Sequence, residues 1–251
     1  MPATALRPRS ATEIIDASFQ LLRRHYTPLV AIAVVALLPY IVLVAVTGGA
    51  ATESPSALLV LLAQWLCAAL AEAAVIVGVS DAYIDGNVDI HRSLVSTAGR
   101  LPTVILAGFL RGLAVLAGAI LFFFPGIYVA LRTFAIIPVV VLEDRSAAES
   151  FRRSWDMAKG EVGKIFGTML LAWLIFIVLY VLLVFTVGLI VGLLASSNER
   201  MSSLLVAILL SLVYPITGVV TTLLYYDIRV RREGYDLELM AREAPSPAPS
   251  A

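Results

Sequence analysis

The stretch that decides the fold is PGIYVALRTFAIIPVVVLEDRSAAESFRRSWDMAKG, residues 125–160. A Pro-Gly pair ends one apolar run, a short apolar run containing Arg132 follows, and Glu143 closes that run. A charged segment containing Ser154 and Trp155 then leads into the next apolar run. The same order of apolar helix, polar connector and amphipathic helix recurs along the chain, so this stretch predicts the architecture of the whole.

The composition indicates an integral membrane protein. Hydrophobic residues make up 60% of the chain and charged residues 14%, a balance that excludes an ordinary soluble domain of this length. Several apolar runs exceed the roughly 18 residues that mark a membrane-spanning helix, and the connectors between them are too short to bury a separate core. We expect one membrane domain over residues 1–243, with its N-terminus retained, and a disordered tail over residues 244–251.

The apolar runs predict six membrane spans that pair as three hairpins, at residues 28–46, 57–79, 102–123, 127–142, 165–194 and 204–226. An amphipathic segment precedes each hairpin, at residues 10–26, 89–101 and 146–162. The first and third of these segments open with the Ser-x-x-Glu spacing of a capping box, and apolar residues then recur at helical spacing. The expected fold class is therefore all-α: a polytopic membrane protein with six transmembrane helices as three hairpins, each preceded by an amphipathic interfacial helix.

The first and third amphipathic segments also align with one another, which sets Ser18 beside Ser154 and Phe19 beside Trp155. The segment at residues 89–101 is a shorter version of the same pattern. Either an internal duplication or a shared amphipathic composition explains the similarity. We expect Phe19 and Trp155 to anchor their helices in the membrane interface; the alternative is that these helices pack on a soluble partner.

The basic residues predict the orientation in the membrane. Of the 18 Lys and Arg residues, 15 fall on the side of the six-span arrangement that carries both termini. Arg111 and Arg132 lie within spans, and Arg200 alone falls on the far side. Basic residues in short loops are retained on the cytoplasmic face, so we expect both termini to be cytoplasmic.

Three ionisable residues inside the predicted spans form the candidate intramembrane polar site: Glu72, Arg111 and Arg132. A charge at mid-membrane is costly unless it is paired or hydrated, so such residues are functional candidates. Glu72 and Arg111 fall at similar depth, and we expect them to pair directly or through water. The alternatives are an ion pair that locks the bundle and a polar cavity for an anionic or lipid ligand. The spacing Gly108-xxx-Gly112 around Arg111 permits close packing of helices.

The sequence gives no indication of catalysis. Cys67 is the single cysteine, and HExxH, GxSxG, phosphate-loop and dinucleotide-binding patterns are all absent from the sequence. We therefore expect no catalytic residues, no cofactor and no metal site. The basic clusters flank apolar runs, which indicates attraction to anionic lipid headgroups and not to nucleic acid.

Four segments of the sequence are RPRSATEIID (7–16), PGIYVALR (125–132), FRRSWDMAKG (151–160) and DIRVRREGYDL (227–237). Together these segments resemble the membrane domain of bacterial glycerophosphoryl diester phosphodiesterases. In enzymes of that family a separate barrel carries the hydrolytic activity, with a His-Arg-Gly motif and a metal-binding Glu-x-Asp. Neither motif occurs in this chain, where residues 91–93 read only His-Arg-Ser.

The resemblance implies a multi-pass protein of the bacterial inner membrane without phosphodiesterase activity. Its expected function is that of a non-enzymatic scaffold or of an accessory or regulatory component in envelope or lipid metabolism. The alternative is a carrier or binder of a lipid or small anionic solute through the polar intramembrane site. The expected partners are the lipid bilayer, including anionic headgroups, and either another protein or a second copy of the chain.

Overall fold

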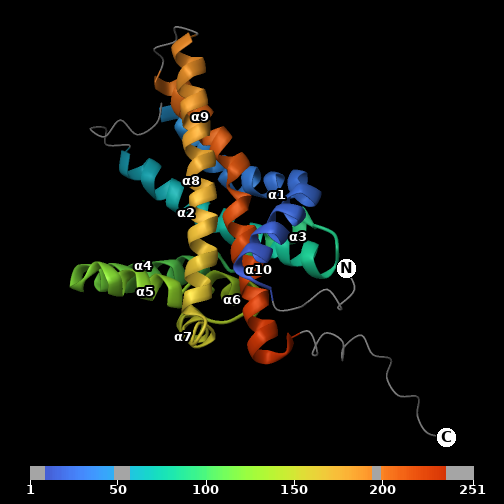
Figure 1. The fold of residues 1–251 in the computed structure, drawn as a ribbon. Coiled ribbons are helices and arrows are strands. Elements are labelled where there is room, and N and C mark those ends of the chain that lie inside the picture. The colour runs from blue at the N-terminus through green and yellow to red at the C-terminus, as the bar shows by residue number, and fades with distance from the viewer. Residues whose placement is uncertain (1–8, 48–56, 194–198, 236–251) are drawn as a thin grey trace, which may run out of the picture.

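The computed structural model describes residues 9–47, 57–193 and 199–235, and every regular element among them is a helix. The predicted tail at residues 244–251 lies outside the described residues. Figure 1 shows the arrangement. In chain order the helices are α1 (Ala11–Thr47), α2 (Ala57–Ile84), α3 (Ile90–Gly99), α4 (Leu101–Leu121), α5 (Phe123–Arg132), α6 (Ile136–Leu142), α7 (Ala147–Met157), α8 (Val162–Leu193), α9 (Glu199–Val213) and α10 (Pro215–Glu233).

The expectation of an all-helical protein with six candidate membrane helices is confirmed. Within the described residues, six helical segments are long and apolar enough to cross a membrane. They are Ala11–Thr47, Ala57–Ile84, Leu101–Leu121, Phe123–Leu142, Val162–Leu189 and Met201–Glu233.

Three of these segments are interrupted. The backbone of α1 leaves helical geometry at His25 (φ −119°, ψ 27°), close to the predicted boundary between an amphipathic segment and a span. Residues 133–135 separate α5 from α6, and Tyr214 separates α9 from α10, which begins at Pro215. A proline suits the first position of a helix because its missing N–H would have no partner there. The fourth and sixth predicted spans are therefore each built from two helices.

The turn between α4 and α5 comes earlier than the Pro-Gly pair suggested. Phe122 is extended (φ −171°, ψ 149°), and Pro125 and Gly126 lie inside the first turns of α5. A Cβ atom on Gly118 would come within 3.0 Å of the Gly126 backbone, and one on Gly126 within 2.9 Å of Ala119. Both glycines are therefore needed for the close approach of α4 to α5, which run side by side across the direction of α8 (Figure 1).

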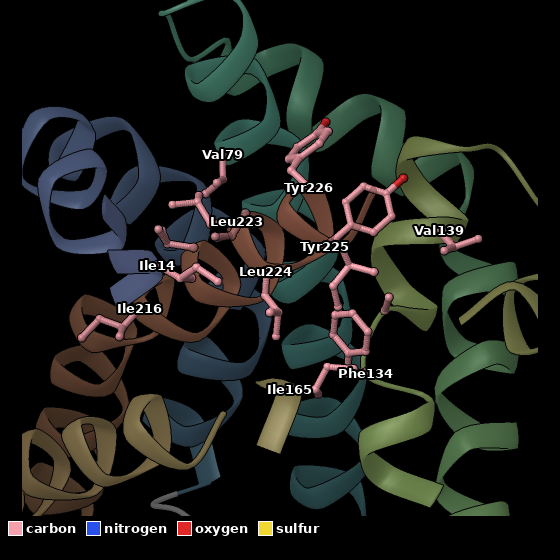
Figure 2. Packing of buried hydrophobic residues seen from close by; sticks show 14 of the residues in the cluster. Ile14, Val79, Phe134, Val139, Ile165, Ile216, Leu223, Leu224, Tyr225 and Tyr226 are labelled. Atoms are coloured by element: carbon pink, nitrogen blue, oxygen red, sulfur yellow. The ribbon is translucent and has the colours of Figure 1, made fainter. Parts of the chain in front are cut away.

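The core forms where α2, α6 and α10 meet the amphipathic part of α1 and the start of α8. Buried residues from all five helices contribute, and Figure 2 shows Ile14, Val79, Val139, Ile165 and Leu224 among them. A Cβ atom on Gly218 of α10 would lie 2.7 Å from Val75 of α2, so these two helices pack closely. The outer parts of the longer helices expose large apolar side chains, as expected for surfaces that face lipid.

Each amphipathic segment begins with a side-chain cap. Ser10 and Glu13 form the predicted capping box, with the Ser10 amide donating to Glu13 at 2.7 Å and the Glu13 amide donating to Ser10 at 3.3 Å. Ser146 and Glu149 form the second capping box. At α3 the cap is Asp89, which accepts a hydrogen bond from the Arg92 amide at 2.9 Å.

Acidic residues at the ends of three core helices bind basic partners. Asp81 of α2 lies 3.4 Å from Arg92, and Glu143 after α6 lies 3.1 Å from Arg153. Asp227 of α10 binds the side chains of Lys164 and Arg231, and it also accepts a hydrogen bond from the backbone N–H of Arg9 at 2.6 Å. The last contact joins residues 218 positions apart.

Candidate functional site

A cavity of about 540 Å³ is bounded by α2, α4, α5, α6 and Tyr214. Glu72 of α2 and Arg111 of α4 both line it, so the structure brings together two of the three predicted residues. We call it the Glu72–Arg111 cavity. The remainder of its wall is largely apolar and includes Trp65, Val115 and Leu116.

Glu72 and Arg111 are both partly buried, and they act on each other electrostatically. Among the described residues, however, no ion pair within 4 Å joins the two side chains. Opposite charges that share a cavity without contact leave donors and acceptors open to a third group. The arrangement therefore suits a polar or zwitterionic headgroup, or water, lying between them.

Two glycines give the cavity its space. Gly108 and Gly112 lie on the face of α4 that lines the cavity, one turn apart. A Cβ atom on Gly112 would meet nothing within 4 Å, and one on Gly108 would only reach Trp65 at 4.0 Å. The close helix packing expected from this spacing does not occur, and the glycines instead leave an open surface beside Arg111.

Tyr214 was not singled out by the sequence, but it also lines the cavity. Its position follows from the interruption between α9 and α10, and its hydroxyl donates to the Ala68 carbonyl at 2.8 Å. Tyr214 also interacts electrostatically with Glu72. The signal that could have found it is Pro215, because a proline inside an apolar run marks a place where a helix ends or bends.

Arg132 lies apart from the cavity. Its side chain is 5% exposed, and its guanidinium lies over the Trp155 ring at 4.7 Å and the Tyr128 ring at 5.7 Å. These distances are typical of cation–π contacts. Its Nε is buried and has no hydrogen-bond partner within the described residues. The three predicted residues therefore divide into a pair at the cavity and a buried arginine against α7.

Ser154, next to Trp155, explains why α7 docks at this point. The Ser154 hydroxyl donates to the Arg132 carbonyl at 3.1 Å and accepts the Ala135 N–H at 3.1 Å. It thus bridges the interruption between α5 and α6, where backbone groups leave the helical ladder.

The two predicted interfacial anchors have different surroundings. Trp155 is partly buried, with ring centroids 6.0 Å from Tyr128 and 6.1 Å from Phe151. Phe19 is 42% exposed on α1. Phe19 thus presents the more open apolar surface, while Trp155 is held against α5.

A second polar cluster, which the sequence did not predict, links the end of α6 to α7 and α10. Arg153 binds Glu143 at 3.1 Å and Glu233 at 2.6 Å. The Tyr225 hydroxyl donates to Glu143 at 3.0 Å, and the Arg229 guanidinium lies 3.9 Å from the centre of the Tyr235 ring. These carboxylates and guanidinium groups satisfy one another, so the cluster holds helices together and leaves little capacity for a ligand.

Within the described ranges, no group of three or more His, Cys, Asp or Glu side chains is arranged so that it could hold a metal ion. Cys67 is a buried free cysteine in the wall between α1 and α2.

Comparison with known proteins identifies one family. The family model described as the membrane domain of glycerophosphoryl diester phosphodiesterase matches residues 90–229, from the start of α3 to the last turns of α10. No curated protein and no solved structure matches the chain. The matched region contains Arg111 and Arg132. It also contains the segment around Trp155, which was one of the segments that carried the resemblance in the sequence. The match covers more than half of the chain, and the chain therefore belongs to the family of the membrane domain of glycerophosphoryl diester phosphodiesterase.

Proposed function

We propose that this protein is a non-enzymatic, multi-pass protein of the bacterial cytoplasmic membrane that binds a lipid or another amphiphile in the Glu72–Arg111 cavity. The observation that carries the proposal is that Glu72 and Arg111 share a cavity of about 540 Å³ without forming an ion pair. A purely structural role would favour paired, dry charges, because an unpaired buried charge is destabilising. A binding site instead requires open polar groups beside apolar walls.

The cavity chemistry supports a particular class of ligand. Arg111 suits a phosphate or carbonyl oxygen, and Glu72 suits an ammonium or hydroxyl group. The surface beside Gly112 and the side chains of Val115 and Leu116 suit an alkyl chain. The ligand class is therefore an amphiphile whose head carries both hydrogen-bond donors and acceptors, as the headgroups of membrane lipids do.

The proposal includes a topology. The six candidate helices form three hairpins within one domain over residues 1–243, each hairpin preceded by an interfacial helix at α1, α3 or α7, and both termini are cytoplasmic. The distribution of the basic residues supports this orientation. The capped starts of the three amphipathic segments and the kink at His25 support the interfacial arrangement.

A scaffold or accessory role is the second candidate function. It is favoured by the ion-pair cluster around Arg153, which links α6, α7 and α10, and by the apolar tip of the α4–α5 hairpin, where Phe122, Phe123 and Phe124 are all exposed. In this role the tip contacts another membrane protein or a second copy of the chain instead of lipid alone.

Filling the cavity tests the binding proposal. The variant Gly112→Leu places a side chain in open space beside Arg111, and Gly188→Leu is a matched control because Gly188 also has nothing within 4 Å but lies on α8, away from the cavity. Native mass spectrometry of protein purified in mild detergent should detect a bound lipid in the wild type and in Gly188→Leu but not in Gly112→Leu. Equal lipid content in all three proteins would refute the proposal and leave the scaffold role.

A further inference from the structure

A separate pocket of about 200 Å³ lies where the kink of α1 meets the end of α2. Its polar lining comes from Arg9, Gln20, Arg24, His25 and Tyr83, and apolar side chains of α1, α2 and α10 form the rest of its wall. We call it the Arg24 pocket. None of its lining residues also lines the Glu72–Arg111 cavity, so the two sites are independent.

The Arg24 pocket is basic. Two of its polar residues, Arg9 and Arg24, are arginines, and in the described part of the chain no carboxylate is among its lining residues. The Arg9 guanidinium lies over the Tyr83 ring at 5.7 Å, and Arg24 acts electrostatically on the neighbouring His25. The nearby carboxylate of Asp227 is already bound by Lys164 and Arg231. Within the described residues the Arg24 side chain forms no ion pair, so its positive charge is available to an anion.

The position of the pocket is defined by two helix features. The kink at His25 separates the amphipathic part of α1 from its apolar part, and Tyr83 lies in the last turn of α2. A pocket at this junction combines a charged rim with an apolar wall. Such a combination matches the boundary between headgroups and acyl chains in a bilayer.

We propose that the Arg24 pocket binds a phosphate group, carried either by an anionic phospholipid headgroup or by a small soluble phosphate ester. Guanidinium groups bind phosphate oxygens through charge-assisted hydrogen bonds. The pocket volume is below the roughly 300 Å³ at which sites for larger ligands begin, so it suits the head of a lipid and not a whole lipid. The attraction of basic flanks to anionic lipid is diffuse, whereas this pocket confines the anion to one place.

Neutralising one pocket arginine tests the proposal, with its neighbour as the control. Arg24 lines the pocket, whereas Arg23 is also exposed but does not line it. Binding of phosphatidylglycerol in mixed micelles and of glycerol 3-phosphate in solution is measured for the wild type, Arg24→Gln and Arg23→Gln. We expect binding to weaken about tenfold in Arg24→Gln, which corresponds to about 1.4 kcal/mol, and by less than about twofold in Arg23→Gln.

Each outcome has a defined meaning. Binding of phosphatidylglycerol alone assigns the pocket to a lipid headgroup, and binding of both probes assigns it to phosphate esters in general. Equal weakening in the two arginine variants indicates diffuse attraction and overturns the proposal, as does the absence of binding by the wild type. Gln20→Glu provides a second variant if Arg24→Gln is unstable, because it adds a repelling carboxylate at an exposed position and removes no packing.

Discussion

Replacing Ser154 with alanine is expected to destabilise the protein much more than the same change at Ser18. Both serines are buried, and they occupy matching positions in the first and third amphipathic segments. Their hydrogen bonds differ. The Ser154 hydroxyl joins the Arg132 carbonyl to the Ala135 amide across a break between helices, whereas the Ser18 hydroxyl donates at 2.7 Å to the Ile14 carbonyl within one helix.

The difference sets the expected magnitudes. A hydrogen bond makes a net contribution of about 0.5–1.5 kcal/mol to the free energy of unfolding, and a buried polar group left without a partner lowers that free energy by about 1–3 kcal/mol. Ser154→Ala removes two hydrogen bonds and leaves the Ala135 N–H unsatisfied, so the expected loss is about 2–4 kcal/mol. The Ile14 carbonyl remains in the helical ladder, so we expect Ser18→Ala to cost less than about 1 kcal/mol.

The assay is reversible unfolding of purified protein in detergent, monitored by tryptophan fluorescence or by circular dichroism. Cysteine-scanning accessibility at Ala135 would show whether the segment between α5 and α6 opens in Ser154→Ala. A loss below about 0.5 kcal/mol in Ser154→Ala, or equal losses in the two variants, would refute the bridging role of this hydroxyl.

Three further results are expected. In protein stripped of lipid, a double-mutant cycle on Glu72→Gln and Arg111→Gln should give a coupling below about 1 kcal/mol, whereas 2–3 kcal/mol would indicate a direct ion pair. Hydrogen bonds from the Ser146 hydroxyl and amide hold the pKa of Glu149 below its usual range. The stability difference between the wild type and Glu149→Gln should therefore be present near pH 7 and disappear as the pH falls well below about 4.3; a constant difference would argue against the capping role. Reporter fusions at Arg200 and at the C-terminus should report the periplasm and the cytoplasm respectively, and a periplasmic C-terminus would overturn the topology.

The sequence predicted those features of the fold that depend on local chemistry. The capping boxes at Ser10 and Ser146 were readable because both partners lie within one helical turn. The number of candidate membrane helices followed from the lengths of the apolar runs alone. The boundary near His25 was marked by a change from amphipathic to uniformly apolar residues.

Features that depend on contacts between distant residues were not predictable in this way. Periodicity shows which face of a helix is buried but does not show its partner, so nothing in the sequence paired Arg132 with Trp155. The position of the turn at Phe122 is set by the packing of Gly118 against Gly126, not by the Pro-Gly pair itself. For the candidate site, the sequence supplied Glu72 and Arg111, but the cavity between them depends on two glycines that it associated with close packing.

The contact between Asp227 and the Arg9 amide also bears on how the protein is made. Translation proceeds from the N-terminus, and its rate of about 5–20 residues per second implies roughly 10–40 s between the synthesis of these two partners. During that interval the start of α1 has been synthesised, but the carboxylate that later binds its backbone has not. Lys164 is likewise synthesised before its partner Asp227. The contact that fixes the backbone at Arg9 can therefore form only after α10 has been synthesised.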